Sequence, residues 1–470
     1  MIKQLTSKKN LNEAYLRVYR NKGAAGVDNI QVTELKAILK AKGKHYAHQT
    51  ERELYEVSPI LGVEIPKSNG KTRLLGIPTA IDRVFQQVLH QVLQPVFEPE
   101  FQQHSYGLRP KRNAHQAVKQ SLENINLGYQ DIVDIDLKSF FDEVEHYVLL
   151  ELISKKVKCK ATMKLLRSFL RAPIQINGKL QKRSKGVPQG SPLSPLLSNI
   201  LLNELDKELE KRGHRYVRYA DDFSIYVKSK ASAKRVGNSI YNFLKNGLFL
   251  PINREKSGVR RPSTFNLLGF GFVPSYKKGE RGKYQLVVEK SKWISFKRKL
   301  KQLTKKTIPI SLEERLHRIN LLIRGWINYF KEASIQAKLK KLEEWLRNRL
   351  RYCIWHDWKK PERKRKNLIR LGIDQGMAYA WSRTRMGGWA VAQSPILRTT
   401  ITVARMKKKG YVSLMDYYKK SKRIIIEPPS MLLRLNVQWT FSRKEGAKLA
   451  YAWWCERRTD GHLTASRLLD

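Results

Sequence analysis

The sequence predicts an α+β fold followed by a basic, mainly helical region, and three observations lead to this prediction. Over residues 63–288, apolar strand-like runs alternate with helical patterns. From Lys290 onward, long helical patterns dense in lysine and arginine take over. Hydrophobic residues make up 41% of the 470 residues and aromatic residues 10%, which is enough to bury real cores and argues against wholesale disorder.

The strands expected in this chain come from its apolar, β-branched runs. Residues 1–60 precede them and are polar and basic, with a short helical pattern at residues 12–19. Residues 131–137 have the composition of a strand, and an amphipathic helix follows it. Residues 217–227 have the composition of two short strands joined by a turn, which predicts a hairpin.

Three later segments have helical periodicity. One helix could begin at Ser194 and Pro195, because serine suits the N-cap and proline the first helical position. Its buried stripe would consist of Leu197, Leu201, Leu205 and Leu209. Over residues 315–330 and 338–355, apolar side chains recur every three or four positions, which predicts two helices with one apolar face each.

The charge of the chain predicts a polyanionic partner. There are 92 Lys and Arg against 41 Asp and Glu, a formal net charge of +51 at pH 7. Such side chains bind nucleic acid favourably because they replace counterions condensed on its phosphates. Basic clusters recur at residues 297–301, 359–366, 407–409 and 419–423. We therefore expect nucleic acid contacts rather than merely solvated faces.

Several other classes of protein are disfavoured. No apolar run approaches the ~20 residues that span a bilayer, and the first residues lack the apolar stretch of a signal peptide. The three cysteines, Cys159, Cys353 and Cys455, form no CxxC pair, which argues against a disulfide framework or a cysteine-rich zinc site. We expect a soluble intracellular protein with no membrane partner.

The predicted hairpin carries two adjacent acidic residues. Asp221 and Asp222 lie at its centre, between apolar positions such as Val217 and Phe223 that share one sequence parity, as half-buried strands require. Adjacent carboxylates repel each other, so this tip requires a cation. A pair of surface carboxylates beside lysines is the alternative interpretation.

A second predicted strand also carries acidic residues, which could bind a metal ion together with the hairpin. Asp134 and Asp136 share one face of the strand at residues 131–137. Carboxylates from this strand and from the hairpin could hold two Mg²⁺ ions, because oxygen ligands suit this hard cation. Two such ions about 3.5–4 Å apart can bind both oxygens of an in-line phosphoryl displacement.

The motif Tyr219-Ala-Asp-Asp222 resembles the catalytic hairpin of bacterial group II intron reverse transcriptases. Further blocks resemble this family in order over residues 10–420. They are LGIPT (75–79) with Asp82 and Arg83, HSYGLRP (104–110), DLKSFFD (136–142), GVPQGSPLSP (186–195), NREKS (253–257), LLGF (267–270), IRGWINYF (323–330), and RMGGW (385–389) through GYVSL (410–414).

The resemblance implies a right-hand polymerase with fingers, palm and thumb, followed by a basic helical maturase region. The implied regions are an N-terminal extension (1–62), fingers–palm (63–290), a helical thumb (291–355), a maturase region (356–420) and a basic tail (421–470). The tail could be a DNA-binding segment. It lacks the cysteine pairs of the His/Asn endonuclease that many relatives carry, so we expect no DNA-cutting domain.

The resemblance also implies the metal site. The catalytic residues would be Asp136, Asp221 and Asp222, and these with Leu137 would bind two Mg²⁺ ions, for which Mn²⁺ could substitute. Asp136 rather than Asp134 is assigned from the family's spacing to Phe141, because periodicity does not separate the two. Phe141 resembles the ring that excludes a ribose 2′-OH, although it could also be an ordinary core aromatic residue.

Further residues resemble the nucleotide-binding positions of the family. Lys67 and Arg73 resemble the triphosphate clamp of the fingers, although a solvated hairpin is the alternative. Gln189 and Gly190 belong to the loop that positions template and nucleotide. Lys256 resembles the residue that helps pyrophosphate to leave, and an exposed lysine without a special role is the alternative.

The implied reaction is the RNA-templated addition of deoxynucleotides to a primer 3′-OH. Its partners would be an RNA template, a DNA primer or target, and dNTPs. A second implied activity is binding of the parent intron RNA, which assists splicing and intron mobility, in the bacterial cytoplasm.

Two alternatives stay open. One is a reverse transcriptase of the same lineage that serves host DNA repair or phage defence. The other is a splicing cofactor or RNA chaperone whose polymerase site is unused. Oligomeric state, intron class and DNA target are left open by the sequence.

Overall fold

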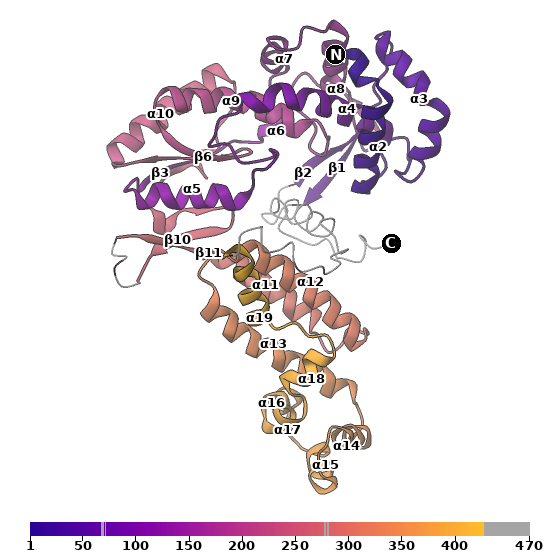
Figure 1. The fold of residues 1–470 in the computed structure, drawn as a ribbon, viewed down its shortest axis with the longest axis vertical. Helices are drawn as coiled ribbons and strands as arrows, with labels where there is room; N and C mark the ends of the chain where they lie inside the picture. Colours follow the sequence, from indigo (N-terminus) through magenta and orange to yellow (C-terminus); the bar gives the residue numbers. More distant parts are fainter. Residues whose placement is uncertain (67–69, 71, 277–278, 280–281, 427–470) are drawn as a thin grey trace. The chain divides into compact units, whose positions relative to one another are not determined.

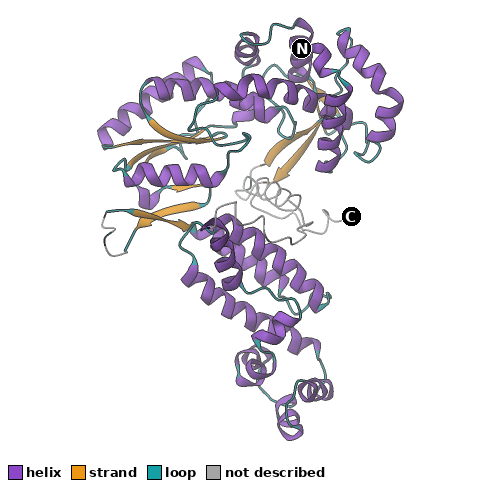
Figure 2. Ribbon diagram, viewed as in Figure 1, coloured by secondary structure: helices purple, strands orange, loops and turns teal. Residues whose placement is uncertain are grey.

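The computed structural model describes residues 1–426 except 67–69, 71, 277–278 and 280–281. The described chain forms two compact units (Figure 1). Unit 1 contains residues 1–265 with the short segment that ends at Tyr284, and unit 2 contains residues 266–279 and those from Gln285 onward. Unit 1 mixes helices and strands, whereas unit 2 is mostly helical (Figure 2). The α+β class and the helical C-terminal region predicted from the sequence are confirmed.

Unit 1 contains ten α-helices and eight strands among its described residues. The helices are α1 (Ile2–Leu5), α2 (Lys8–Asn21), α3 (Leu35–Glu51), α4 (Ala80–Phe97), α5 (Ala114–Asn126), α6 (Phe140–Glu143), α7 (His146–Ser154), α8 (Lys160–Arg171), α9 (Ser194–Lys211) and α10 (Lys230–Gly247). The strands are β1 (Ile60–Pro66), β2 (Thr72–Ile77), β3 (Asp131–Asp136), β4 (Ile174–Ile176), β5 (Lys179–Gln181), β6 (Arg215–Tyr219), β7 (Asp222–Val227) and β8 (Gly258–Arg260).

Two four-stranded sheets organise unit 1. One has the order β2-β1-β4-β5. The other has the order β6-β7-β3-β8, with antiparallel neighbours throughout, and it carries the acidic residues. Helix α10 packs on β3 and β7, and α5 packs on β6 from the other side of this sheet (Figure 1). The second sheet is therefore covered by helices on both faces.

The β6–β7 hairpin is confirmed, but two details of the prediction are wrong. Every residue from Phe223 to Val227 is buried, so β7 is buried on both faces and not half-buried, because helices cover both sides of the sheet. The hairpin also has a two-residue turn, which pairs Tyr219 with Asp222 and Arg218 with Phe223. As paired residues share a face, Val217 and Phe223 lie on opposite faces although their sequence parity is the same.

Helix α9 confirms the predicted leucine stripe and corrects the predicted start. The four leucines of the stripe are at most 2% exposed, and they belong to the main core of unit 1. The N-cap residue is Leu193 and not Ser194. The Ser194 hydroxyl instead donates to the Pro188 carbonyl at 2.7 Å, which ties the first turn of α9 to the preceding loop.

Unit 2 combines one small sheet with helices. The sheet has the order β11-β10-β9, formed by β9 (Asn266–Leu267), β10 (Phe270–Pro274) and β11 (Tyr284–Val288). The helices are α11 (Lys290–Leu303), α12 (Leu312–Phe330), α13 (Gln336–Asp357), α14 (Pro361–Arg370), α15 (Gln375–Ser382), α16 (Gly388–Gln393), α17 (Pro395–Thr400), α18 (Val403–Lys408) and α19 (Leu414–Ile426).

The apolar helical faces predicted in this region are present. Ile319, Ile323 and Ile327 of α12 are fully buried, and so are Leu339 and Leu346 of α13. Aromatic packing joins α11 to α12, where the rings of Phe296 and Trp326 stack with centroids 4.3 Å apart. In the described part of the chain, the helices all fall short of the length and apolarity needed to cross a bilayer.

Candidate active site

The strand register places two of the predicted catalytic residues opposite each other. Asp136 at the end of β3 pairs with Asp222 at the start of β7, and the neighbouring pair is Ile135 with Phe223. Paired residues of antiparallel strands point to the same face with their Cβ atoms about 4.5–5.5 Å apart. Asp221 occupies the turn beside Asp222. Asp136 and Asp222 are therefore neighbours on one face of the sheet.

Three residues of a following segment surround Asp136. The Asn253 Nδ2 donates to Asp136 Oδ2 at 3.0 Å, and the Lys256 Nζ lies 3.5 Å from the same oxygen. The Asp136 backbone N–H donates to the Ser257 hydroxyl at 3.0 Å. The structure thus places Lys256 at the acidic site, where its ammonium partly neutralises Asp136.

Asp134 lies on the same face but has a different partner. Its Oδ2 accepts from Arg260 Nε at 2.8 Å, from the adjacent strand β8. Burial raises the pKa of Asp134 above its ordinary value, and the Arg260 guanidinium opposes this shift. The nearby charge of Asp136 raises the pKa of Asp134 further. A structural ion pair thus engages Asp134, whereas Asp136 is the carboxylate that faces the hairpin tip.

The turn that carries Asp221 has a constrained backbone. Ala220 has φ of +57°, which non-glycine residues adopt at a cost of about 1–3 kcal/mol. A neighbouring loop is packed directly against it: a Cβ added to Gly107 would lie 2.2 Å from the Ala220 nitrogen. Only glycine at position 107 permits this approach, so the loop at residues 104–107 supports the turn.

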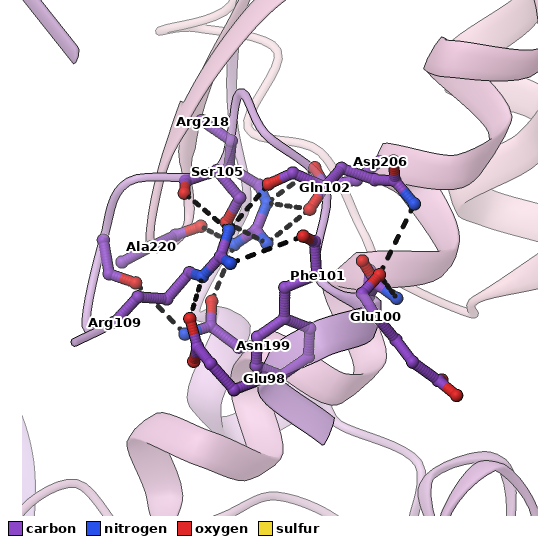
Figure 3. A network of polar contacts seen from close by, with 12 residues as sticks. Glu98, Glu100, Phe101, Gln102, Ser105, Arg109, Asn199, Asp206, Arg218 and Ala220 are labelled. Atoms are coloured by element: carbon purple, nitrogen blue, oxygen red, sulfur yellow. Dashed lines mark hydrogen bonds and ion pairs between the residues drawn. The ribbon is translucent and has the colours of Figure 1, made fainter. Parts of the chain in front are cut away.

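A fully buried ion pair fixes the loop and the turn in place (Figure 3). Arg218 of β6 and Asp206 of α9 are both 0% exposed, and the Arg218 Nε donates to Asp206 Oδ1 at 2.8 Å. The remaining guanidinium N–H groups donate to Asp206 Oδ2, the Asn199 Oδ1, the Ser105 hydroxyl and the Ala220 carbonyl. All five N–H donors of Arg218 are therefore satisfied. One of them holds the turn residue that precedes Asp221.

A second arginine, Arg109, binds the backbone of the segment that leads into the loop at residues 104–107 (Figure 3). Arg109 donates from Nε to Glu98 at 2.9 Å and from Nη1 to the carbonyls of Gln102 and Ser105 at 2.6 and 2.9 Å. The loop also pairs with β6, because the Tyr106 N–H donates to the Arg218 carbonyl at 2.8 Å. The position of the Ser105 hydroxyl beside Arg218 follows from these contacts.

Gln189 and Gly190 belong to a loop at residues 186–190, and this loop contacts two other residues predicted to bind the nucleotide, Arg73 and Phe141. The side chain of Arg73 on β2 donates from Nε to the Gln189 Oε1, and the Gly76 N–H donates to the Gln189 carbonyl at 3.0 Å. Gly190 has φ of +117°, and a Cβ there would lie 3.0 Å from the Gly76 carbonyl oxygen. The structure thus brings Arg73, Gln189 and Gly190 together.

The same loop contacts the helix that carries Phe141. The Val187 N–H donates to the Phe141 carbonyl at 2.7 Å, and a Cβ added to Gly186 would meet that carbonyl at 3.0 Å. The Phe141 ring is 5% exposed and lies edge-to-face with Phe140, with centroids 5.3 Å apart. Lys67, the other residue of the predicted clamp, lies outside the described residues.

The donor set suits a hard divalent cation, although the carboxylates do not form a ready-made cluster. Across the described residues, no three acidic, histidine or cysteine side chains are grouped closely enough to hold a metal ion. Asp136 and Asp222 nevertheless share a face, and the Leu137 carbonyl takes no part in the hydrogen bonds of its bridge to Ile252. A bound cation would replace the charge that Lys256 supplies to Asp136.

Several residues of this site were not singled out from the sequence. Arg218 has a local signal, because a charge inside an apolar strand needs a buried partner. Asp206 and Asn199 have none, since they lie on another segment. Ser105 belongs to the block HSYGLRP (104–110) that resembles the family, but its hydrogen bond to Arg218 appears only in the structure. Asn253 belongs to a block that resembles the family, but its hydrogen bond to Asp136 appears only in the structure.

The comparisons with known families agree with this geometry. The family described as "Reverse transcriptase (RNA-dependent DNA polymerase)" matches residues 65–272, which include β3, the β6–β7 hairpin and the loop at 186–190. The family described as "Group II intron, maturase-specific domain" matches residues 294–372, within unit 2. These two matches define the class: a reverse transcriptase (RNA-dependent DNA polymerase) with a group II intron maturase domain.

Individual relatives support the same assignment. Protein YkfC of Escherichia coli is 31% identical over 299 residues, which are 55% of this chain and 78% of that protein. Group II intron-encoded protein LtrA of Lactococcus lactis subsp. cremoris is 30% identical over 181 residues, which are 38% of this chain and 30% of that protein. The chain belongs to the group II intron reverse transcriptase/maturase family. This confirms the resemblance seen in the sequence, and the family implies a divalent metal ion and nucleic acid substrates.

The chain also has a weak likeness to a solved structure. The chain described as "Partial Cas6-RT-Cas1--Cas2 complex" is 22% identical with a TM-score of 0.35, over 52% of this chain and 42% of that chain. A score at this level does not establish a common fold.

The buried ion pair gives a stability prediction. We expect Asp206→Asn to lower the free energy of unfolding by about 3–5 kcal/mol, because it leaves the Arg218 guanidinium buried without a counter-charge. Urea unfolding of the full chain measures this loss. Glu208→Gln on the same helix is the matched control: its partner Arg212 is partly exposed, so the loss should stay below about 1 kcal/mol. Equal stability of the two variants would contradict the role of the ion pair.

Proposed function

We propose that this chain extends a DNA primer on an RNA template and also binds a group II intron RNA, assisting its splicing and mobility. The observation that carries the polymerase activity is the register that sets Asp136 opposite Asp222, beside the turn with Asp221. In this proposal residues 63–290 are the fingers and palm of a right-hand polymerase, residues 291–355 the thumb, and residues 356–420 the maturase region. Residues 1–62 are an N-terminal extension, and most of the tail at 421–470 lies outside the described residues.

Each residue of the site has a distinct task in this reaction. Asp136, Asp221 and Asp222, with the Leu137 carbonyl, would hold two Mg²⁺ ions. When bound, these ions supply Lewis-acid chemistry, which acidifies the primer 3′-OH and neutralises charge on the phosphates. Lys256, 3.5 Å from Asp136 and 63% exposed, would offer a positive charge to the departing pyrophosphate.

The nucleotide would lie against the loop at residues 186–190. Arg73 would bind the triphosphate, because a guanidinium contacts phosphate oxygens with two parallel hydrogen bonds. Gln189 holds Arg73 from the other side, and Gly190 lets the backbone pass close to β2. Phe141, joined to the loop through Val187, would then press against the sugar and exclude a 2′-OH.

The double variant Asp221→Ala, Asp222→Ala separates the two proposed activities. It removes metal ligands but no cation that binds RNA, so cDNA synthesis should fall by several orders of magnitude. RNA affinity should hold or rise slightly, because two negative charges are lost. Primer extension and a splicing assay with the intron RNA, run on the same preparation, measure both effects.

The reciprocal variant is Arg363→Gln, Lys366→Gln on α14, where both side chains are exposed. It should weaken intron binding more than extension of a generic annealed primer. If the double-alanine variant folds but loses splicing together with synthesis, the maturase half of the proposal is wrong. If it retains synthesis, the assignment of Asp221 and Asp222 as metal ligands is wrong. If the wild-type chain itself assists splicing but makes no cDNA, an RNA chaperone with an unused polymerase site becomes the better interpretation.

The proposed gate can be tested with two neighbouring phenylalanines. Phe141→Ala should increase the incorporation of ribonucleotides relative to deoxynucleotides, because it opens space for the 2′-OH. Phe140→Ala removes an equally buried ring from the same helix and should leave this ratio unchanged. Single-nucleotide extension with each nucleotide gives the ratio independently of the fraction of folded protein. The same ratio in both variants would rule out Phe141 as the gate.

A further inference from the structure

Residues of α11 and α13 in unit 2 line an open groove. Its volume is about 340 Å³, within the range of small-molecule sites, roughly 300–1,000 Å³. The apolar part of its lining includes Trp293 and Ile294 from α11 and Trp345 from α13. Ile294 is 57% exposed, and both tryptophans are only half-buried. The aromatic side chains are therefore partly exposed at the surface, where flexible basic side chains lie over them.

Four lysines surround these rings. Lys290 and Lys297 come from α11, and Lys338 and Lys341 come from α13. All four are exposed, the groove has no acidic lining residue, and none of the four pairs with a carboxylate in the described chain. The groove thus has unneutralised positive charge around an apolar, aromatic floor.

The lysines and rings are paired across the two helices. Lys297 of α11 lies over the Trp345 ring of α13, with its Nζ 5.2 Å from the centroid. Lys338 of α13 lies over the Trp293 ring of α11 at 5.8 Å. Behind the groove, Trp293 packs on Trp326 of α12 with centroids 4.6 Å apart, which holds its ring in place. Each ring therefore has a cation over it, and the Trp293 ring is in addition supported by Trp326.

We infer that this groove binds unstacked nucleotides of single-stranded RNA, with bases stacked on Trp293 or Trp345 and phosphates on the lysines. Grooves that combine cations with aromatic faces bind single strands in this way, because every base has a π-face and every linkage a charge. A duplex hides its bases and offers only phosphates. The inference rests on the proposed binding of intron RNA by this chain. It adds that the bound RNA is single-stranded at the groove, and it names the residues that contact the RNA.

The test is equilibrium binding of the full chain to a labelled single-stranded RNA 12-mer, followed by fluorescence anisotropy without dNTPs. Trp345→Leu should weaken binding by about ten-fold, within the range of roughly 5–150-fold for losing one stacked base, and Trp345→Phe should restore most of it. For a perfect RNA duplex of equal length, the same Trp345→Leu variant should lose less than about three-fold in affinity.

A matched pair of charge variants tests the groove without changing a tryptophan. Lys297→Gln, Lys341→Gln acts inside the groove, and Lys301→Gln, Lys340→Gln removes the same charge from exposed positions on the same helices. The first variant should weaken single-strand binding several-fold more than the second, and lower the salt slope by about 0.7 for each lost phosphate contact.

Four outcomes would overturn the inference, and the first three concern how RNA binding responds to the variants and to a competitor. These are equal losses in the two lysine variants, unchanged single-strand affinity in Trp345→Leu, and competition by polyglutamate as effective as that by RNA. Tighter groove-dependent binding of single-stranded DNA than of RNA would also contradict it. Primer extension by the wild-type chain and splicing by the Asp221→Ala, Asp222→Ala variant test the proposed function separately, so failure of one is distinguishable from failure of the other.

Discussion

The fully buried ion pair between Arg218 and Asp206 is the interaction on which the acidic site depends. Two charges removed from water cost several kcal/mol each, and they are tolerated only when every donor and acceptor around them is satisfied. Arg218 meets this condition only if α9, the loop at residues 104–107 and the hairpin turn adopt one arrangement. The guanidinium therefore couples three segments, and through the Ala220 carbonyl it fixes the backbone that leads to Asp221.

The rest of the site follows from that arrangement by short connections. The hairpin sets the register of β7 against β3, which places Asp136 beside Asp222. Five residues after Asp136, Phe141 contacts the loop at residues 186–190, and that loop in turn contacts β2 with Arg73. The acidic pair is a small negative site in a chain with a net charge of +51. This contrast suits the proposed polymerase activity, in which cations would bind at the acidic pair and the basic surfaces would hold the nucleic acid.

Local sequence patterns predicted the elements well, because those elements follow local rules. The strand at 131–136, the hairpin and the apolar faces of α9, α12 and α13 are all present. The prediction of which hairpin side chains share a face was wrong, because residues of equal sequence parity on the two strands share a face only for certain turn lengths. The partners of Arg218 could not be predicted, since Ser105 lies 113 positions away in sequence. The groove between α11 and α13 could not be predicted either, because its two halves come from segments that are distant in sequence. Trp345 lies off the apolar face of α13, and the residues that complete the site come from α11.

The most direct test of this account is Mn²⁺ binding by the Gly107→Ala variant, followed by electron paramagnetic resonance. The added Cβ would lie 2.2 Å from the Ala220 nitrogen, so the turn must move while all three aspartates remain. Gly325→Ala, where a Cβ meets nothing within 4 Å among the described residues, is the control. We expect weaker Mn²⁺ binding and slower nucleotide incorporation for Gly107→Ala only. Affinity and incorporation equal to those of the wild type would contradict the claim that the buried network positions the acidic site.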